Sequence, residues 1–311
     1  MQYLRSNLLL LCLLYFLALH AREDDNDDKK RGNFALPGSQ QPSTFFTFGQ
    51  NILEKDLLMA LNYLEYRKID GAYICTEFPY ALYGIRNDLS ILVACPFVIS
   101  FDGSCRKVGI GDIYGQLEYA YYQKDLGTSQ IQTTLVGGMS LPTGSGRAAV
   151  PTILEPGATG ILSLTSPVAA RIPAGLGAVG FFLGTTAAFY SQCTYVFACL
   201  GGGLPTSHHG TRFGKQLLYQ VGIGNNLTYR PNEMIFSCLV ELFGNYMTRN
   251  RICGIMDPNS GGNLFHVAPS LFLSTQHFII EMGVAFPVAQ HFFGTQSKEK
   301  FTFAVQMAWT F

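Results

Sequence analysis

The sequence predicts an all-β fold: a transmembrane antiparallel β-barrel of about twelve strands that follows a cleaved signal peptide. Three observations predict it. Of the 311 residues, 48% are hydrophobic and only 14% are charged, against roughly 25% charged residues in a typical soluble domain. Apolar side chains recur with a period of two along most of the chain. The connections between these alternating segments are short and long in turn, as in transmembrane barrels.

The N-terminus has the features of an export signal. Arg5 supplies a positive charge, and a continuous apolar run of twelve residues, Leu8 to Leu19, follows it. Twelve residues are too few to cross a bilayer as a helix, which needs about twenty. We therefore expect removal near Ala21, so that residues 1–21 are a signal peptide; the alternative is a short membrane anchor.

Residues 22–56 are expected to form a charged, flexible periplasmic lead-in. Their first part, residues 22–31, is dominated by charged side chains, and such runs normally stay solvated. The later part contains proline, glutamine and the cluster Phe45-Phe46-Thr47-Phe48. The period of two begins at Leu57, so the barrel is expected to span residues 57–311.

The last segment, residues 301–311, shows the alternation most clearly. One parity is apolar and largely aromatic: Phe301, Phe303, Val305, Met307, Trp309 and Phe311. Successive strand side chains point to opposite faces, so one face of this strand is apolar and the other small or polar. A soluble sandwich would pack that face on a second sheet, whereas a membrane barrel presents it to lipid. The terminal Phe311 resembles the signal read by the outer-membrane barrel assembly machinery, so this machinery and the lipid bilayer are the expected partners.

The same alternation predicts twelve strands and sorts their connections into two classes. The strands are expected near 57–66, 76–85, 89–100, 109–122, 130–141, 177–190, 194–201, 215–229, 234–248, 262–273, 277–289 and 300–311. Short connections at 86–88, 123–129, 191–193, 230–233 and 274–276 alternate with mostly longer ones at 67–75, 101–108, 142–176, 202–214, 249–261 and 290–299. This alternation favours an outer-membrane barrel over a soluble sandwich, with the short turns in the periplasm. The longest connection, 142–176, is hypothesised to fold over or into the mouth.

The polar parity of the strands supplies the candidate site. A charge facing lipid costs about 2–4 kcal/mol at the midplane for Lys or Arg, and less for Asp or Glu, so polar groups should face the lumen. The candidate lumen-lining residues are Asp112, Gln116, Glu118, Gln132, Gln220, Glu241, Glu281 and Gln306. Two interpretations stay open: these groups stiffen the wall by hydrogen bonding, or they line a slightly acidic polar path.

No motif predicts catalytic residues, a cofactor or a metal. Residues 175–180 match GxGxxG, but a proline-rich loop precedes them and no helix pattern follows, as a dinucleotide site would need. His266 and Ser270 would lie about 13 Å apart along one strand, too far for a hydrogen bond. The histidines are scattered, and the neighbouring His208 and His209 point apart in an extended loop. A net charge of zero argues against nucleic acid as a partner.

Four short motifs resemble a known family. They are Leu141-Pro142-Thr143-Gly144-Ser145, Phe213-Gly214-Lys215-Gln216-Leu217-Leu218-Tyr219, Ser260-Gly261-Gly262 and Gly283-Val284-Ala285-Phe286-Pro287-Val288. Over about residues 43–311 the chain is similar to bacterial outer-membrane proteins described as transporters of the meta-cleavage pathway of phenol degradation. The resemblance implies a barrel of the twelve-strand type in the outer membrane and uptake of small, aromatic compounds. It carries over no catalytic residue.

The sequence therefore predicts a bacterial outer-membrane channel or transporter for small, aromatic or hydrophobic molecules, and not an enzyme. Two alternatives stay open. The first is a plugged structural or surface-interaction barrel without transport. The second is a membrane-embedded lipase whose residues come from several strands.

Overall fold

The computed structural model describes residues 36–49, 52–70, 72–102, 105–127, 129–144, 178–208 and 211–311. The predicted signal peptide, residues 1–21, and the charged run 22–31 lie outside these residues. So does most of the connection 142–176, whose predicted position over the mouth stays a prediction. Among the residues described, no helix is both long enough and apolar enough to span a membrane.

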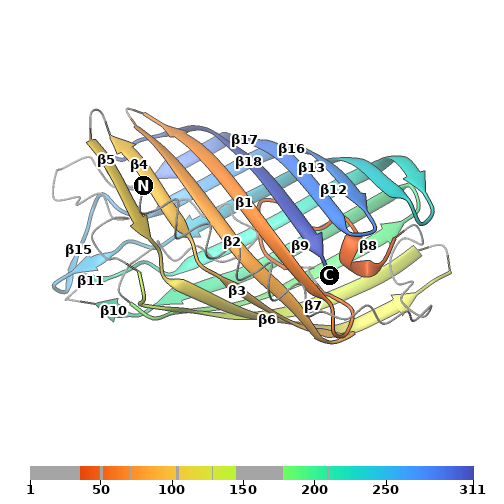
Figure 1. The fold of residues 1–311 in the computed structure, drawn as a ribbon. Helices are drawn as coiled ribbons and strands as arrows, with labels where there is room; N and C mark the ends of the chain where they lie inside the picture. The colour runs from red at the N-terminus through yellow and green to blue at the C-terminus, as the bar shows by residue number, and fades with distance from the viewer. Residues whose placement is uncertain are drawn as a thin grey trace.

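The fold is a closed antiparallel β-barrel, as the sequence predicts (Figure 1). Its strands are β1 (Leu58–Ile69), β2 (Ala72–Arg86), β3 (Leu89–Ala94), β4 (Phe97–Asp102), β5 (Cys105–Ile110), β6 (Ile113–Asp125), β7 (Ser129–Leu141), β8 (Gly180–Ser191), β9 (Thr194–Pro205), β12 (Gln216–Arg230), β13 (Met234–Met247), β16 (Gly262–Thr275), β17 (Phe278–Phe292) and β18 (Glu299–Thr310). Because β4 continues β3 and β6 continues β5, these segments form twelve barrel strands. The ring closes where β1 pairs with both β2 and β18.

Two neighbouring barrel strands are interrupted at the same level. One break lies at Cys95-Pro96, between β3 and β4, and the other at Gly111-Asp112, between β5 and β6. Proline has no N–H to give to the sheet. The breaks are bridged by hydrogen bonds from the Cys95 N–H to the Pro79 carbonyl (3.2 Å) and from the Gly111 N–H to the Pro96 carbonyl (2.7 Å). Beyond the breaks β4 pairs with β5, and β5 pairs with no further strand in the described chain.

The two faces of the sheet differ as the alternation predicts. Buried and exposed residues alternate strictly along β8, and the exposed parity of β8 and β9 includes Leu183, 64% exposed, and Leu200, 53% exposed. Large apolar side chains occupy this outer parity around the ring. A monomeric soluble protein rarely exposes so large an apolar surface. An outer wall of this kind is solvated by acyl chains, so the apolar face is the lipid face.

The two ends of the barrel differ in their connections. The short turns at 87–88, 126–127, 192–193, 231–233 and 276–277 lie at the end where the chain enters β1 and leaves β18. There Leu58 and Phe311 exchange backbone hydrogen bonds of 2.8 and 3.3 Å; recognition of Phe311 by the assembly machinery stays a prediction. The opposite end carries a small sheet of β10 (Ser207–His208), β11 (Thr211–Arg212), β14 (Arg251–Ile252) and β15 (Ile255–Met256), visible in Figure 1. By the rule for outer-membrane barrels, this is the extracellular end.

Two of the predicted long connections are wrong. Residues 67–75 and 101–108 were expected to be loops, but β1 extends to Ile69, β2 begins at Ala72, β4 extends to Asp102 and β5 begins at Cys105. Cross-strand aromatic contacts explain the longer strands. The ring of Tyr66 lies 5.8 Å from that of Tyr73 and 6.0 Å from that of Phe301, so three strands support one another where a loop was expected.

The predicted position of residues 22–56 in the periplasm is also wrong for the part that the structure describes. Residues 36–49 and 52–54 lie inside the barrel, not in the periplasm; we call them the internal segment (Figure 1). Lys55 and Asp56, which follow it, are exposed at the end with the tight turns. The helical turn η1 (Gly38–Gln40) of the segment lies near the end with the tight turns. The physical reason is hydrophobic: Phe45, Phe46 and Phe48 are fully buried, and three exposed aromatic rings would be costly in water. The first barrel strand starts at Leu58, one residue after the expected start.

The close contact between the internal segment and β2 gives a first prediction. A Cβ atom on Gly84 would lie 2.0 Å from the backbone oxygen of Glu54, whereas one on Gly137 would meet nothing within 4 Å. We expect Gly84→Ala to lower the free energy of unfolding by about 1–3 kcal/mol, because backbone must move. Gly137→Ala is the control and should be neutral or slightly stabilising. Urea-unfolding midpoints in micelles measure both, and equal midpoints would contradict this placement of the segment.

Candidate functional site

The candidate site is the lumen around the internal segment. Aromatic rings of the segment contact three well-separated strands of the wall. Phe46 stacks on Phe243 of β13, with ring centroids 5.5 Å apart. Phe45 meets Tyr63 of β1 edge-on at 5.6 Å, and Phe48 contacts Phe182 of β8 at 4.6 Å. The segment therefore crosses the lumen and is held from several sides.

The wall leaves room for these rings by carrying glycine on its inner face. A Cβ atom on Gly184 would lie 2.5 Å from the ring of Phe48, and one on Gly201 would lie 2.7 Å from the same ring. These residues belong to β8 and β9, neighbouring strands of the sheet. The ring of Phe48 thus fits a recess that side chains of any larger residue would fill.

A buried carboxylate binds the backbone of the segment at the same place. Oε1 of Glu241, on β13, accepts hydrogen bonds from the N–H of Phe45 (2.9 Å) and of Phe46 (3.4 Å), and Gln220 also donates to it. Glu281 is buried nearby and interacts electrostatically with Glu241. The Glu241 carboxylate of the wall thus accepts hydrogen bonds from backbone N–H groups of the segment, which are not part of the sheet.

Further polar contacts attach the segment nearer the tight-turn end. The amide of Gln40 donates to Thr310 Oγ1 (2.6 Å) and accepts a hydrogen bond from the hydroxyl of Ser274 (3.2 Å). The N–H of Leu53 donates to the Ser90 hydroxyl at 2.9 Å. These contacts reach β18, β16 and β3, again on different sides of the ring.

Glu54 of the internal segment has a buried carboxyl group, and this burial disfavours its ionised form. Burial raises the pKa of its carboxyl above the ordinary value of 4.5, and weaker hydrogen bonds, among them one from the backbone N–H of Ser39, oppose this shift. In the described chain no cation forms an ion pair with it. Ionised Glu54 therefore weakens the attachment of the segment, and protonated Glu54 does not.

All eight residues proposed from the sequence lie buried inside the barrel, but they do not form one site. Gln220, Glu241 and Glu281 face the segment, as described above. On β6, Tyr114 donates to Gln116 (2.8 Å), which donates to Glu118 (2.6 Å). The other contacts are Gln132 to Thr134 at 3.3 Å, Tyr80 to Gln306 at 2.9 Å, and the Gly144 N–H to Asp112 at 2.8 Å. A role in lining a solute path stays a prediction.

An ionic cluster at the extracellular half of the lumen was missed from the sequence. Arg67 of β1 binds Glu65 and lies 3.5 Å from Glu299 of β18, and Glu299 also binds His266 of β16 at 2.9 Å. Thr302 donates to the same carboxylate at 2.8 Å. Arg67 and Glu299 fall in segments expected to be loops, which is why the sequence did not place them inside. Extending the predicted strand 57–66 by one residue would have placed Arg67 on its inward parity.

A stack of rings joins the ionic cluster to the internal segment. The ring of His266 lies 4.7 Å from that of Phe243, with the planes 18° apart, and Phe243 in turn stacks on Phe46. The two polar regions of the lumen are thus connected by three parallel rings. In the described residues, no group of three His, Cys, Asp or Glu side chains could hold a metal ion.

A closed antiparallel ring with an apolar outer face and with tight turns at the end where β1 begins and β18 ends defines an outer-membrane β-barrel. The protein belongs to this structural class, and its location is the bacterial outer membrane. Solved structures agree on the fold: the COG4313 outer membrane channel from Pseudomonas putida F1 superposes with a TM-score of 0.61 at 12% identity, over 87% of this chain and 99% of that one. No protein-family model and no curated protein matches the sequence.

Two other solved barrels are similar to a lower degree. The KdgM porin has a TM-score of 0.40 at 9% identity, over 81% of this chain and 99% of that one. The translocator domain of the autotransporter NalP from Neisseria meningitidis has a TM-score of 0.41 at 8% identity, over 81% and 87%. These values are too low to say more than that all are barrels.

Removal of the Glu241 carboxylate should loosen the segment. Glu241→Ala leaves the N–H groups of Phe45 and Phe46 buried without an acceptor, which should lower the free energy of unfolding by about 1–3 kcal/mol. Glu241→Gln keeps an acceptor oxygen and should recover most of the loss. Glu233→Ala, in an exposed turn, is the matched control and should change little. Urea-unfolding midpoints test this, and an unchanged Glu241→Ala midpoint would contradict the assigned contact.

Glu54 predicts a pH dependence with a definite sign. Because its folded-state pKa is raised, the folded protein holds this proton more tightly than the unfolded chain. Its contribution to stability is therefore present in acid and is lost as pH rises from about 4.5 through the raised pKa. Relative to Glu54→Gln, the wild type should lose stability over this range. Unfolding midpoints at pH 4 to 8 check it, and a constant difference between the two proteins would refute it.

Proposed function

We propose that the protein is an outer-membrane channel for small molecules and that the internal segment narrows and controls its lumen. The observation that carries this proposal is that the segment lies within a closed ring without joining its sheet. A twelve-stranded barrel encloses more space than an eight-stranded one, which side chains alone can fill. The space is here occupied by a separate stretch of chain, held by side-chain contacts that can be exchanged.

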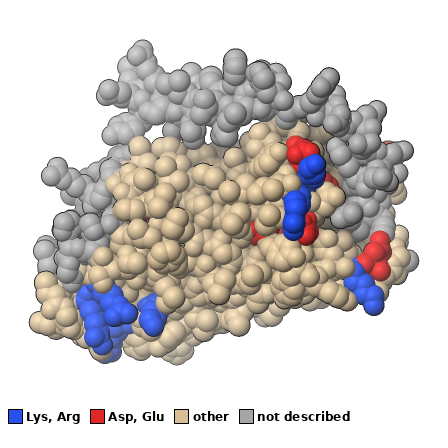
Figure 2. Space-filling model, turned by 90° about the horizontal axis from the view of Figure 1, so that it is seen from below, with Lys and Arg blue, Asp and Glu red and all other residues tan. Residues whose placement is uncertain are grey.

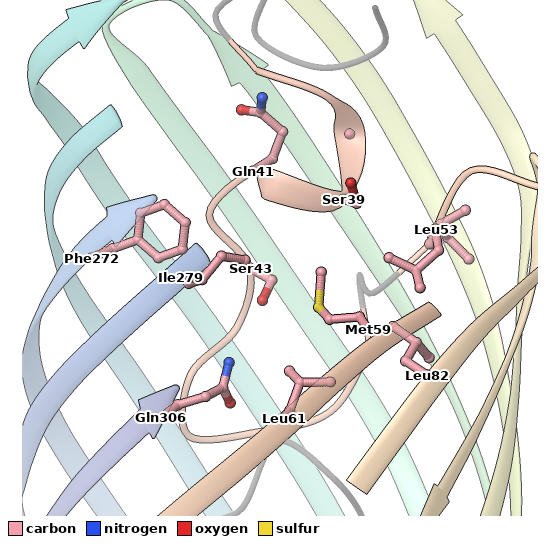
Figure 3. A pocket seen from close by; sticks show the side chains of 12 residues that line it. Ser39, Gln41, Ser43, Leu53, Met59, Leu61, Leu82, Phe272, Ile279 and Gln306 are labelled. Atoms are coloured by element: carbon pink, nitrogen blue, oxygen red, sulfur yellow. The ribbon is translucent and has the colours of Figure 1, made fainter. Parts of the chain in front are cut away.

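The small size of the cavities beside the internal segment supports the proposal that this segment moves when a solute passes. One lies between Ser39 and Gln41 of the segment and Leu61 and Phe272 of the wall, and Figure 3 shows these side chains around it. Its volume is about 20 Å³, and a second cavity near Glu54 measures about 30 Å³. Each has space for about one or two water molecules. Neither cavity admits an organic solute, so in our proposal such a solute passes when the segment is displaced.

The chemistry of the lumen favours flat, weakly polar solutes. Displacement of the segment would uncover the rings of Tyr63, Phe182 and Phe243, which now pack on its phenylalanines. An aromatic solute could replace these contacts, each worth about 0.5–1.5 kcal/mol beyond its buried area. The resemblance of four sequence motifs to transporters of the phenol meta-cleavage pathway supports the same class of solute.

A reversible tether tests whether the segment controls passage. The side chain of Thr47 lies beside the thiol of Cys199 on β9, which itself contacts the Phe48 carbonyl at 3.6 Å. In Thr47→Cys, oxidation should form a disulfide with Cys199 and fix the segment in the lumen. We expect single-channel conductance in planar bilayers to be low when oxidised and several-fold higher after reduction. Thr47→Cys combined with Cys199→Ala cannot form this tether and should not respond to reductant.

The same recordings separate the proposal from its main alternative. The polar contacts of the segment could also serve a permanently plugged structural barrel. Such a barrel would show no conductance in the wild type or in the reduced variant. Equal conductance of the oxidised and reduced variant would show instead that solutes bypass the segment, and would overturn its role as a gate.

A further inference from the structure

The two ends of the barrel carry exposed charges in different ways. At the periplasmic end, opposite charges lie side by side: Lys55 with Asp56 at 3.6 Å, Arg86 with Asp88 at 2.9 Å, and Arg230 with Glu233 at 3.6 Å. At the extracellular end Lys300 pairs with Asp70 at 3.1 Å, but a group of exposed cations, which we call the cationic surface, has no ion pair within the described chain: Arg212, Lys215, Arg249 and Arg251. Figure 2 shows both: blue and red side by side at one end, and a patch of blue without red at the other.

The small extracellular sheet brings these cations together. Arg212 of β11 and Arg251 of β14 are register partners, so they lie directly opposite each other. Like charges in opposed positions destabilise a sheet unless an anion lies between them. Arg249 is fixed beside them: its guanidinium lies 4.7 Å above the ring of Phe293 and 3.8 Å from the sulfur of Met256, the register partner of Arg251. Three guanidinium groups therefore belong to one small surface of this sheet.

The cationic surface adjoins the lipid face. Lys215 has the same parity as the outward-facing Leu217, the first exposed residue of β12, and lies two residues beyond it, which is about 7 Å along a strand. Leu217 pairs with the exposed Tyr246, and tyrosine is typical of the edge of a membrane barrel. The sheet also exposes apolar side chains next to its arginines, with Ile255 75% exposed. Its ligand should therefore combine anionic groups with an apolar part at the membrane surface.

We propose that the cationic surface binds the phosphate groups of lipopolysaccharide, the phosphorylated glycolipid of the outer leaflet. An arginine guanidinium can donate two parallel hydrogen bonds to one phosphate, whereas a lysine ammonium lacks this planar geometry. A phosphate between Arg212 and Arg251 removes their repulsion, and Arg249 and Lys215 contact a second phosphate or the same one. The balanced periplasmic end faces a leaflet that does not require such a site.

Binding of lipid A to the refolded full-length protein in micelles tests the proposal. We expect Arg212→Gln combined with Arg251→Gln to weaken binding about tenfold or more, because charge-assisted hydrogen bonds are lost. Arg86→Gln combined with Arg230→Gln removes the same charge from the other end and should bind like the wild type. Binding to the wild type should also weaken as salt is raised. An unchanged midpoint of heat unfolding shows that each variant is folded; Arg249→Gln replaces the double variant if it is not.

Two further ligands distinguish the source of the phosphate. Dephosphorylated lipid A should bind the wild type and the arginine variants equally and weakly, and inorganic phosphate alone should bind far more weakly than lipid A. Equal binding of phosphorylated and dephosphorylated lipid A would overturn the proposal, because the acyl chains alone would then account for it. Inorganic phosphate bound as tightly as lipid A would overturn it in favour of a site for soluble anions.

Discussion

A peptide N–H or C=O group left unpaired in hydrocarbon costs several kcal/mol, and the closed ring of strands in this protein avoids that cost. β1 pairs with β2 on one side and with β18 on the other, so the ring of strands closes. Closure of the sheet in turn determines which kinds of side chain suit its outer and inner faces. Outward positions are apolar because they meet lipid, and inward positions are free to be polar, small or ionic. The lumen is a consequence of this closure.

Closure also creates a space that must be filled or hydrated. Here the protein fills much of it with its own N-terminal residues, and the wall is adapted to them. Gly184 and Gly201 leave room for the ring of Phe48, and Glu241 accepts the backbone donors of the segment. The buried Arg67 is paired with Glu65 and Glu299, because an isolated buried charge would be costly. The interior is therefore a specific surface, not a generic pore lining.

Much of this could be predicted from the sequence because it depends on local order. The period of two is a local signal, so the twelve strands and the inward parity of residues such as Glu241 and Gln306 follow from it. Two features could not be predicted. Strand ends depend on partners far away in the chain, as the contact of Tyr66 with Phe301 shows, and this misplaced Arg67 and Glu299. The position of Phe45 and Phe46 depends on a cavity that exists only once the ring has closed.

The contacts that hold the internal segment differ from those that hold the strands of the barrel wall. Had the segment joined the sheet as a further strand, moving it would break a ladder of backbone hydrogen bonds. Its backbone is instead bound by a few side chains, Glu241 at Phe45 and Phe46 and Ser90 at Leu53 among them. Each such bond contributes about 0.5–1.5 kcal/mol net, because water can replace it. Under the proposed gating, the segment would therefore leave its position without breaking a ladder of the ring, and the lipid-facing wall need not change.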